Sequence, residues 1–79
     1  MGKYEHYCQL IMKAIEERGG RYDAAPGQVI NGLAARTGLT SGTVWNAVVM
    51  LAGRKLVVIE RVRPDGSMPG NRISAVRRT

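Results

Sequence analysis

Few residues in this 79-residue sequence could act as nucleophiles or metal ligands. The only histidine and the only cysteine, His6 and Cys8, lie two positions apart in MGKYEHYCQL. Side chains at that separation on a helix do not face each other, so the pair lacks the geometry for nucleophilic catalysis. One cysteine cannot form an internal disulfide, and no Cys or His cluster has the spacing of metal ligands. We therefore predict no enzymatic activity, no metal site and no cofactor.

Positive charge is the other chemical feature of the sequence, and it is concentrated near the C-terminus. The formal net charge is +6. Residues 1–53 carry five basic and four acidic side chains, whereas residues 54–79 carry seven basic and two acidic ones. A bound anion would relieve repulsion between like charges on neighbouring strands. The pattern indicates a polyanionic partner, although net charge alone would also suit an acidic protein or membrane headgroups. The clustered arginines are Arg61, Arg63, Arg72, Arg77 and Arg78.

Three segments have the patterning of amphipathic helices, and they are predicted over residues 4–18, 27–37 and 41–53. In the first, apolar residues recur at steps of three and four, which gathers them on one face. Gly19-Gly20 follows this segment and supplies the left-handed conformation with which helices commonly end. We expect the three helices to form a small bundle.

The second and third helices are joined by a tight turn. Gly38 is expected to end the second helix, and the hydroxyl of Thr40 or Ser41 can cap the third. Gly32, inside the second helix, costs about 1 kcal/mol relative to alanine. We therefore expect another part of the backbone to approach closely at Gly32.

After the third helix the sequence changes to a β-strand pattern. LVVIERVR and RISAVRR are rich in β-branched residues, and the intervening PDGSMPGN contains several turn-forming residues. This predicts a β-hairpin over residues 56–78, while RYDAAP at 21–26 could form a brief edge strand. The length allows one domain, 1–79, with one modest core. The predicted fold class is α+β, a three-helix bundle followed by a C-terminal β-hairpin.

The order of these elements resembles the winged helix-turn-helix superfamily of DNA-binding regulators, over nearly the whole chain. The likeness is sharpest in LAARTGLTSGTVWNAVVML, where Ala34, Gly38, Val44 and the pair Ala47-Val48 fall at the spacings of a helix-turn-helix motif. A small side chain lets two helices cross closely, and the glycine permits the sharp turn. The resemblance implies that the helix over 41–53 is the recognition helix and that the hairpin is the wing.

Two features depart from the superfamily pattern. Lys55 stands before Leu56, where many relatives carry glycine. No further helix follows the wing to build the dimer found in many regulators of this type. The sequence therefore does not decide whether the protein binds DNA as a homodimer.

The resemblance implies that the third helix enters the major groove, where its outward residues Ser41, Thr43 and Asn46 would read base edges. An asparagine amide can donate to and accept from adenine, and a threonine methyl can contact a thymine methyl. In the alternative interpretation, Ser41 and Thr43 only cap the helix and Asn46 faces solvent. Trp45, at the border of the apolar face, is expected to pack. The other DNA-contact candidates, for the phosphate backbone or minor groove, are Arg36, Arg54, Arg61, Arg63 and Arg72.

We therefore predict a sequence-specific double-stranded DNA-binding protein, either a transcriptional regulator or a phage or mobile-element factor. Nine Arg against three Lys suggests a GC-rich bacterial or phage genome. No apolar run reaches the roughly 18 residues that span a bilayer, so we expect a cytoplasmic protein without membrane contact. The alternative is a winged-helix module that binds an acidic protein partner, for which exposed Val49, Met50 and Met68 would be suited. RNA binding is less supported, because no GXXG loop or sheet with paired surface aromatics is evident.

Overall fold

The computed structural model describes residues 3–62 and 72–79, which form three helices and three strands. The elements are α1 (Lys3–Glu17), β1 (Arg21–Asp23), α2 (Val29–Thr37), α3 (Ser41–Gly53), β2 (Val57–Val62) and β3 (Arg72–Arg78). The α+β class expected from the sequence is confirmed. The bounds of α3 coincide with the expected range, and α1 is displaced by one residue at each end.

α2 begins two residues later than the sequence suggests, because the preceding segment is a turn. Gly27 has a φ of +82°, which is incompatible with a right-handed helix. Its N–H donates to the carbonyl of Ile73 on β3 at 3.0 Å, and the N–H of Gln28 donates to the carbonyl of Ala25 at 2.9 Å. The start of α2 is therefore set by a bond to the sheet rather than by local patterning.

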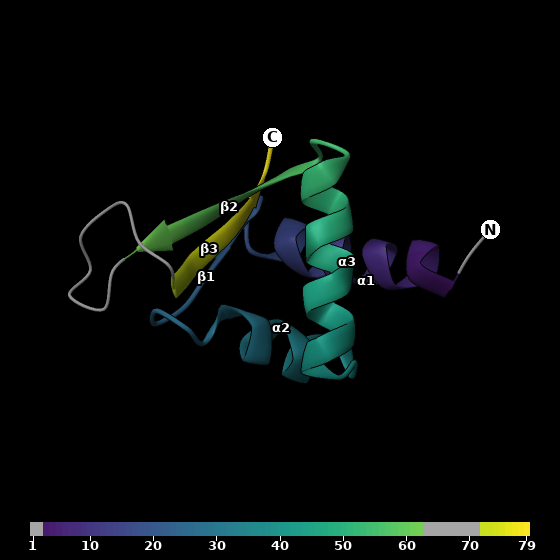
Figure 1. Cartoon of the computed structure of the whole chain (residues 1–79), viewed down its shortest axis with the longest axis horizontal. Helices are drawn as coiled ribbons and strands as arrows, with labels where there is room; N and C mark the ends of the chain where they lie inside the picture. The colour runs from purple at the N-terminus through teal and green to yellow at the C-terminus, as the bar shows by residue number, and fades with distance from the viewer. Residues whose placement is uncertain (1–2, 63–71) are drawn as a thin grey trace.

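The three strands form one antiparallel sheet in the order β1-β3-β2. The hairpin strands β2 and β3 pair with each other, and β1 adds to the free edge of β3 (Figure 1). Tyr22, Val76 and Ile59 lie in register across the sheet. The pairing shifts between Glu60 and Arg61, which is the irregularity of a β-bulge.

The core lies between the three helices and one face of the sheet. Its largest fully buried side chains come from all three helices and from β3, and no polar or charged residue is buried among the described ones. On α1 and α3 these residues recur at three- and four-residue steps, as expected for one face of each helix. They are Ile11, Ile15, Leu33, Leu51, Val29, Val44, Val48 and Val76.

Two helices end in the same backbone motif but with different residues at its left-handed position. After α1, the N–H groups of Gly20 and Gly19 donate to the carbonyls of Ile15 and Glu16, and Gly19 has a φ of +76°. After α3, the N–H groups of Leu56 and Lys55 donate in the same way to Leu51 and Ala52. Here the left-handed residue is Lys55, with a φ of +61°.

The close approach expected at Gly32 is present, but a side chain rather than the backbone makes it. A Cβ atom on Gly32 would lie 2.7 Å from the hydroxyl oxygen of Tyr22 and 3.3 Å from Cε1 of its ring. Tyr22 comes from β1 and is buried. Gly32 therefore leaves room for the tyrosine that attaches β1 to α2.

Figure 1 shows how this core presents α3. The helix crosses in front of α1, α2 lies near its beginning, and β2 leads away from its end toward one side. Both α1 and α2 pack against α3. One long face of α3 thus remains uncovered by the other described elements. None of the helices in the described ranges has the length and apolar character needed to cross a membrane.

Candidate nucleic-acid interface

The uncovered face of α3 carries no charge. None of the thirteen residues of α3 is acidic or basic. Gly42, Trp45, Asn46 and Val49 are exposed on it, with 37% of the Trp45 surface and 45% of the Val49 surface accessible to solvent. The face therefore offers apolar contacts and one amide.

A hydroxyl cap fixes the beginning of α3. Thr40 is the N-cap residue, and its Oγ1 accepts a bond from the backbone N–H of Thr43 at 3.3 Å. The Thr40 hydroxyl also donates to Oγ1 of Thr43 at 2.9 Å. Of the two capping candidates, the structure thus selects Thr40, and Ser41 is left exposed in the first turn. Of the two predicted hydroxyl readers, Thr43 is engaged within the cap.

Asn46 lies in the middle of the exposed face and contacts α1. Its Nδ2 donates to the hydroxyl oxygen of Tyr4 at 3.3 Å. The two residues are 42 positions apart in sequence, so the contact depends on the packing of α1 against α3. Asn46 therefore points neither freely into solvent nor into the core. Its amide is held by a neighbouring helix while remaining exposed.

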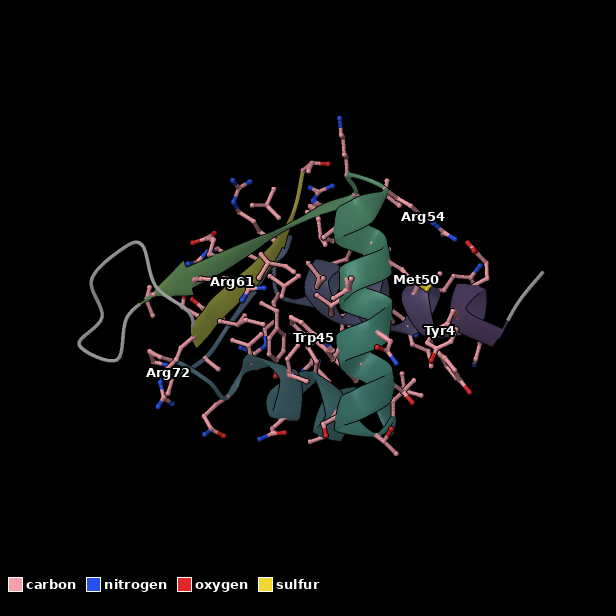
Figure 2. All side chains as sticks on the ribbon, in the orientation of Figure 1. Tyr4, Trp45, Met50, Arg54, Arg61 and Arg72 are labelled. Carbon is pink, nitrogen blue, oxygen red and sulfur yellow. The ribbon has the colours of Figure 1, made fainter. Side chains whose placement is uncertain are left out.

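Trp45 is more exposed than expected, because the sequence predicts that it packs at the edge of the apolar face. The guanidinium carbon of Arg61, on β2, lies 5.8 Å from the centre of the Trp45 ring, within the range of a cation–π contact. In Figure 2 the two side chains lie between α3 and the hairpin. The pair connects the uncovered helix face to the sheet.

Two of the predicted phosphate contacts, Arg36 and Arg54, are already paired with carboxylates. Nε of Arg36 lies 3.7 Å from Glu17, and Nη1 of Arg54 lies 3.1 Å from Glu5. Both pairs are exposed, and surface pairs of this kind contribute about 0–1 kcal/mol. A phosphate approaching either arginine would therefore compete with a weak internal partner.

Arg61 and Arg72 differ from these two arginines. Within the described ranges, neither forms an ion pair, and both are exposed. A guanidinium nitrogen of Arg72 comes close to Gly27, so this side chain reaches toward the turn before α2. Figure 2 shows Arg61 and Arg72 on the sheet side of α3 and Arg54 on the α1 side. The predicted contacts at Arg63 and Met68 lie outside the described residues.

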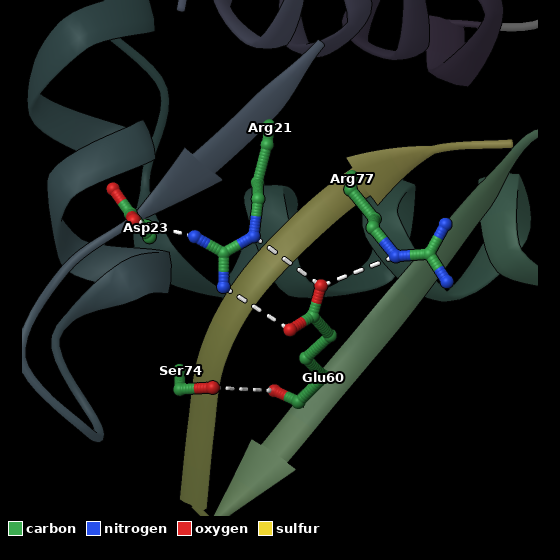
Figure 3. Close-up of polar contacts among 5 residues, drawn as sticks. All are labelled: Arg21, Asp23, Glu60, Ser74 and Arg77. Atoms are coloured by element: carbon green, nitrogen blue, oxygen red, sulfur yellow. Dashed lines mark hydrogen bonds and ion pairs between the residues drawn. The ribbon is translucent and has the colours of Figure 1, made fainter.

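The outer face of the sheet is a network of compensating charges. Arg21 and Arg77 are cross-strand partners, and Glu60 of β2 accepts from both: 3.1 Å to Nη2 of Arg21 and 3.2 Å to Nε of Arg77 (Figure 3). Asp23 pairs with Arg21 at 2.6 Å. Hydrogen bonding from Arg21, with the charges of both arginines, lowers the pKa of Glu60. Arg77, one of the five clustered arginines, is therefore used within the sheet.

All acidic side chains of the described residues are paired with arginines. Each of the five carboxylate side chains lies 2.6 to 3.7 Å from an arginine nitrogen. The remaining pair joins Glu16 to Arg78. Among the described residues, Arg61 and Arg72 of the sheet have no carboxylate partner, and Arg61 contacts Trp45 on α3.

The cysteine and histidine lie in different environments. Cys8 is buried, its Sγ donates to the carbonyl of Ala47 at 3.8 Å, and desolvation raises the pKa of its thiol. His6 is exposed. In the described ranges no group of three or more His, Cys, Asp or Glu side chains could hold a metal ion.

Sequence reasoning did not identify Tyr4 as part of this surface. Tyr4 belongs to the apolar pattern of the first helix and packs half-buried against the core, and nothing local signals that its hydroxyl meets Asn46. Trp45 was recognised as a border residue, but its exposure depends on how β2 leaves α3.

Comparisons with protein-family models, with curated proteins and with solved structures find no match to this chain. The α+β architecture and the uncovered face of α3 are therefore the basis for assigning a class of function.

Proposed function

We propose that this protein binds double-stranded DNA, with α3 in the major groove and arginines of the sheet on the phosphate backbone. In this proposal α2 and α3 form a helix-turn-helix, and β2 and β3 form the wing of a winged-helix fold. The element order and the pairing of β1 with β3 support this assignment. We further propose a regulatory rather than catalytic protein that acts in the cytoplasm.

The observation that carries the proposal is the combination of an uncovered helix with arginines on the sheet that lack a carboxylate partner among the described residues. Arg61 and Arg72 have no carboxylate partner among the described residues, whereas the described acidic side chains are all paired. Phosphates would supply the missing counter-charge, and the released counterions would favour binding. The major groove is about 12 Å wide and admits an α-helix. α3 carries no carboxylate that the phosphates flanking the groove would repel.

The test is a binding titration of the whole chain against a labelled random-sequence duplex at low salt. We expect saturable binding that Arg61→Ala and Arg72→Ala weaken on every duplex. Lys13→Ala is the matched control, because it removes one exposed positive charge from α1, which passes behind α3 (Figure 1). Loss of affinity in Lys13→Ala equal to that in the arginine variants would show that only net charge matters. A parallel titration with duplex RNA distinguishes the two nucleic acids.

A second candidate function is favoured by the apolar residues of the same surface. Trp45, Val49 and Leu56 are large hydrophobic side chains with 37 to 45% of their surface exposed. Trp45 and Val49 on the uncharged α3, with Leu56 just after it, would also suit a protein partner with an apolar contact surface and an acidic rim. Absence of binding to any duplex at low salt would favour this candidate over DNA.

A further inference from the structure

We propose that α3 reads A·T base pairs, through thymine methyl groups and one amide that Tyr4 holds in a fixed orientation. This inference rests on the proposed DNA binding and specifies what kind of target that surface would select. It follows from which hydrogen-bonding groups α3 has, which it lacks, and how Asn46 is held.

The composition of α3 argues against direct reading of G·C pairs. The usual bidentate contact to guanine needs an arginine or lysine, and the contact to the amino group of cytosine needs a carboxylate. α3 contains none of these residues. The hydroxyls of Ser41 and Thr43 can contact either kind of base pair, and that of Thr43 is already bonded to Thr40. The group on α3 best suited to bidentate recognition is the amide of Asn46.

The contact with Tyr4 leaves Asn46 with the groups that adenine requires. One hydrogen on Nδ2 goes to the Tyr4 hydroxyl, so the second Nδ2 hydrogen and the Oδ1 lone pairs stay available. Adenine presents an acceptor at N7 and a donor at its N6 amino group. Because the bond to Tyr4 restrains the side-chain torsions of Asn46, and with them the position and plane of its amide, Tyr4 is a positioning residue for this recognition.

The neighbours of Asn46 on the exposed face suit thymine. Trp45 and Val49 lie four positions apart on the same side of the helix, and both are exposed. Thymine differs from cytosine in the major groove partly by its C5 methyl group, which makes apolar contacts. Trp45 and Val49 would bury such methyls, and each buried methyl is worth about a fourfold gain in affinity.

The experiment begins with selection of bound sequences from a random duplex pool by the whole chain. We expect selected sites to contain A·T pairs at the positions covered by α3. Replacing a thymine there by deoxyuridine removes only the methyl, and should weaken binding about fourfold. Replacing the read adenine by 7-deazaadenine removes N7 and should weaken wild-type binding, but not binding by Asn46→Ala. Asn46→Ala itself should lower the preference for the selected site by about 5- to 150-fold.

Tyr4→Phe tests the positioning role, with Tyr7→Phe as its matched control. Tyr7 is the edge-on ring neighbour of Tyr4 on α1, and no hydrogen bond of its hydroxyl is seen within the described residues. Tyr4→Phe should reduce discrimination between adenine and 7-deazaadenine while keeping affinity for scrambled duplex and the thermal unfolding of the wild type. Tyr7→Phe should keep the discrimination.

The outcomes separate the inference from the function on which it rests. Binding that is unaffected by deoxyuridine and 7-deazaadenine, or selection of G·C pairs under α3, would overturn the A·T reading and leave DNA binding intact. Equal effects of Tyr4→Phe on adenine and 7-deazaadenine would overturn the role of Tyr4. Failure to bind any duplex would overturn the proposed function, and the reading with it.

Discussion

Lys55 occupies a backbone conformation that favours glycine. It follows α3 with a φ of +61°, at the left-handed position of the helix-ending motif. For a residue with a Cβ atom this conformation costs about 1–2 kcal/mol. The resemblance noted in the sequence implied a glycine at this position, and the backbone angle is one that glycine adopts without strain. Lys55 is thus a site of local backbone strain at the junction between α3 and β2.

Lys55→Gly should stabilise the protein. Relief of the left-handed strain is partly offset by the greater freedom of glycine in the unfolded chain, so the expected gain is about 0.5–1 kcal/mol. Chemical denaturation at neutral pH measures it. Gly19→Ala is the converse change, because Gly19 holds the same position after α1 with a φ of +76° and has open space around its Cα. It should destabilise. If both changes stabilised the protein, or both destabilised it, the strain at Lys55 could not be attributed to its positive φ.

Residue-level prediction succeeds where the determinant is local. The capping of α3 by a hydroxyl and the stops at Gly19 and Gly38 follow from residue types next to the helix ends. The bond between Asn46 and Tyr4 does not, since it joins positions 42 apart. Crowding at Gly32 was expected because a glycine inside a helix is unfavourable unless another group needs the space. Its source, the ring of Tyr22, required the pairing of β1 with β3 to be known.

At the scale of elements, Glu60 holds together a sheet that would otherwise place two arginines side by side. Arg21 and Arg77 are direct cross-strand partners, and like charges at such positions are destabilising. Glu60, from the third strand, accepts from both (Figure 3). It therefore links β1 to β2 through side chains, although these strands are not adjacent in the sheet.

Glu60→Gln should lower stability at neutral pH by about 0.5–1 kcal/mol, the upper range for an exposed pair. The pKa of Glu60 is lowered in the folded state, mainly by hydrogen bonding from Arg21, relative to an ordinary value of 4.5. Its contribution is thus complete above pH 4.5 and is lost as the pH falls through the folded-state pKa. Thermal unfolding from neutral to acidic pH should show the wild type and the variant converging.

Glu16→Gln provides the control for this prediction, because Glu16 pairs with a single arginine, Arg78. It should destabilise less than Glu60→Gln at neutral pH. A gap between wild type and Glu60→Gln that stays constant down to low pH would show that the carboxylate charge is not what holds the strands.

The elements themselves were largely predictable, and the exceptions have a common cause. Helical periodicity located α1 and α3 to within one residue at each end, because their core faces repeat at three and four positions. The beginning of α2 was misplaced because the N–H of Gly27 bonds to β3. The edge strand β1 was only suggested, since three residues carry too little pattern to specify pairing. Each exception depends on a contact with β3, which is distant in sequence.

At the scale of the molecule, the positions of the carboxylate side chains decide which arginines are available to bind phosphate. The net charge of +6 suggested a polyanion, but the sequence could not say which cations are already neutralised. Pairs such as Arg54 with Glu5 join positions 49 apart and depend on the crossing of α1 and α3. Arg54 is therefore a conditional contact, available to DNA only when it leaves Glu5.

Glu5→Gln should consequently strengthen duplex binding. The change frees Arg54 and removes a negative charge beside the end of α3, so a phosphate would no longer compete with an internal partner. Log K should then fall more steeply with log salt, by up to about 0.9 per additional phosphate neutralised. Titrations of wild type and variant on one duplex at several salt concentrations measure both quantities. Arg54→Ala should abolish the gain when combined with Glu5→Gln, because the freed guanidinium is its source.

The control for net charge is again Glu16→Gln, which changes the charge of the molecule by the same amount but frees Arg78 on β3 instead. If proximity to α3 is decisive, Glu5→Gln steepens the salt dependence of binding. Glu16→Gln then raises affinity only through the weaker long-range field of the protein, which salt screens over about 10 Å at 0.1 M. Equal slopes for the two variants would mean that the protein attracts DNA through overall charge rather than through a defined surface around α3. A slope unchanged by either variant would remove Arg54 from the phosphate contacts and leave Arg61 and Arg72 of the sheet as the candidates for them.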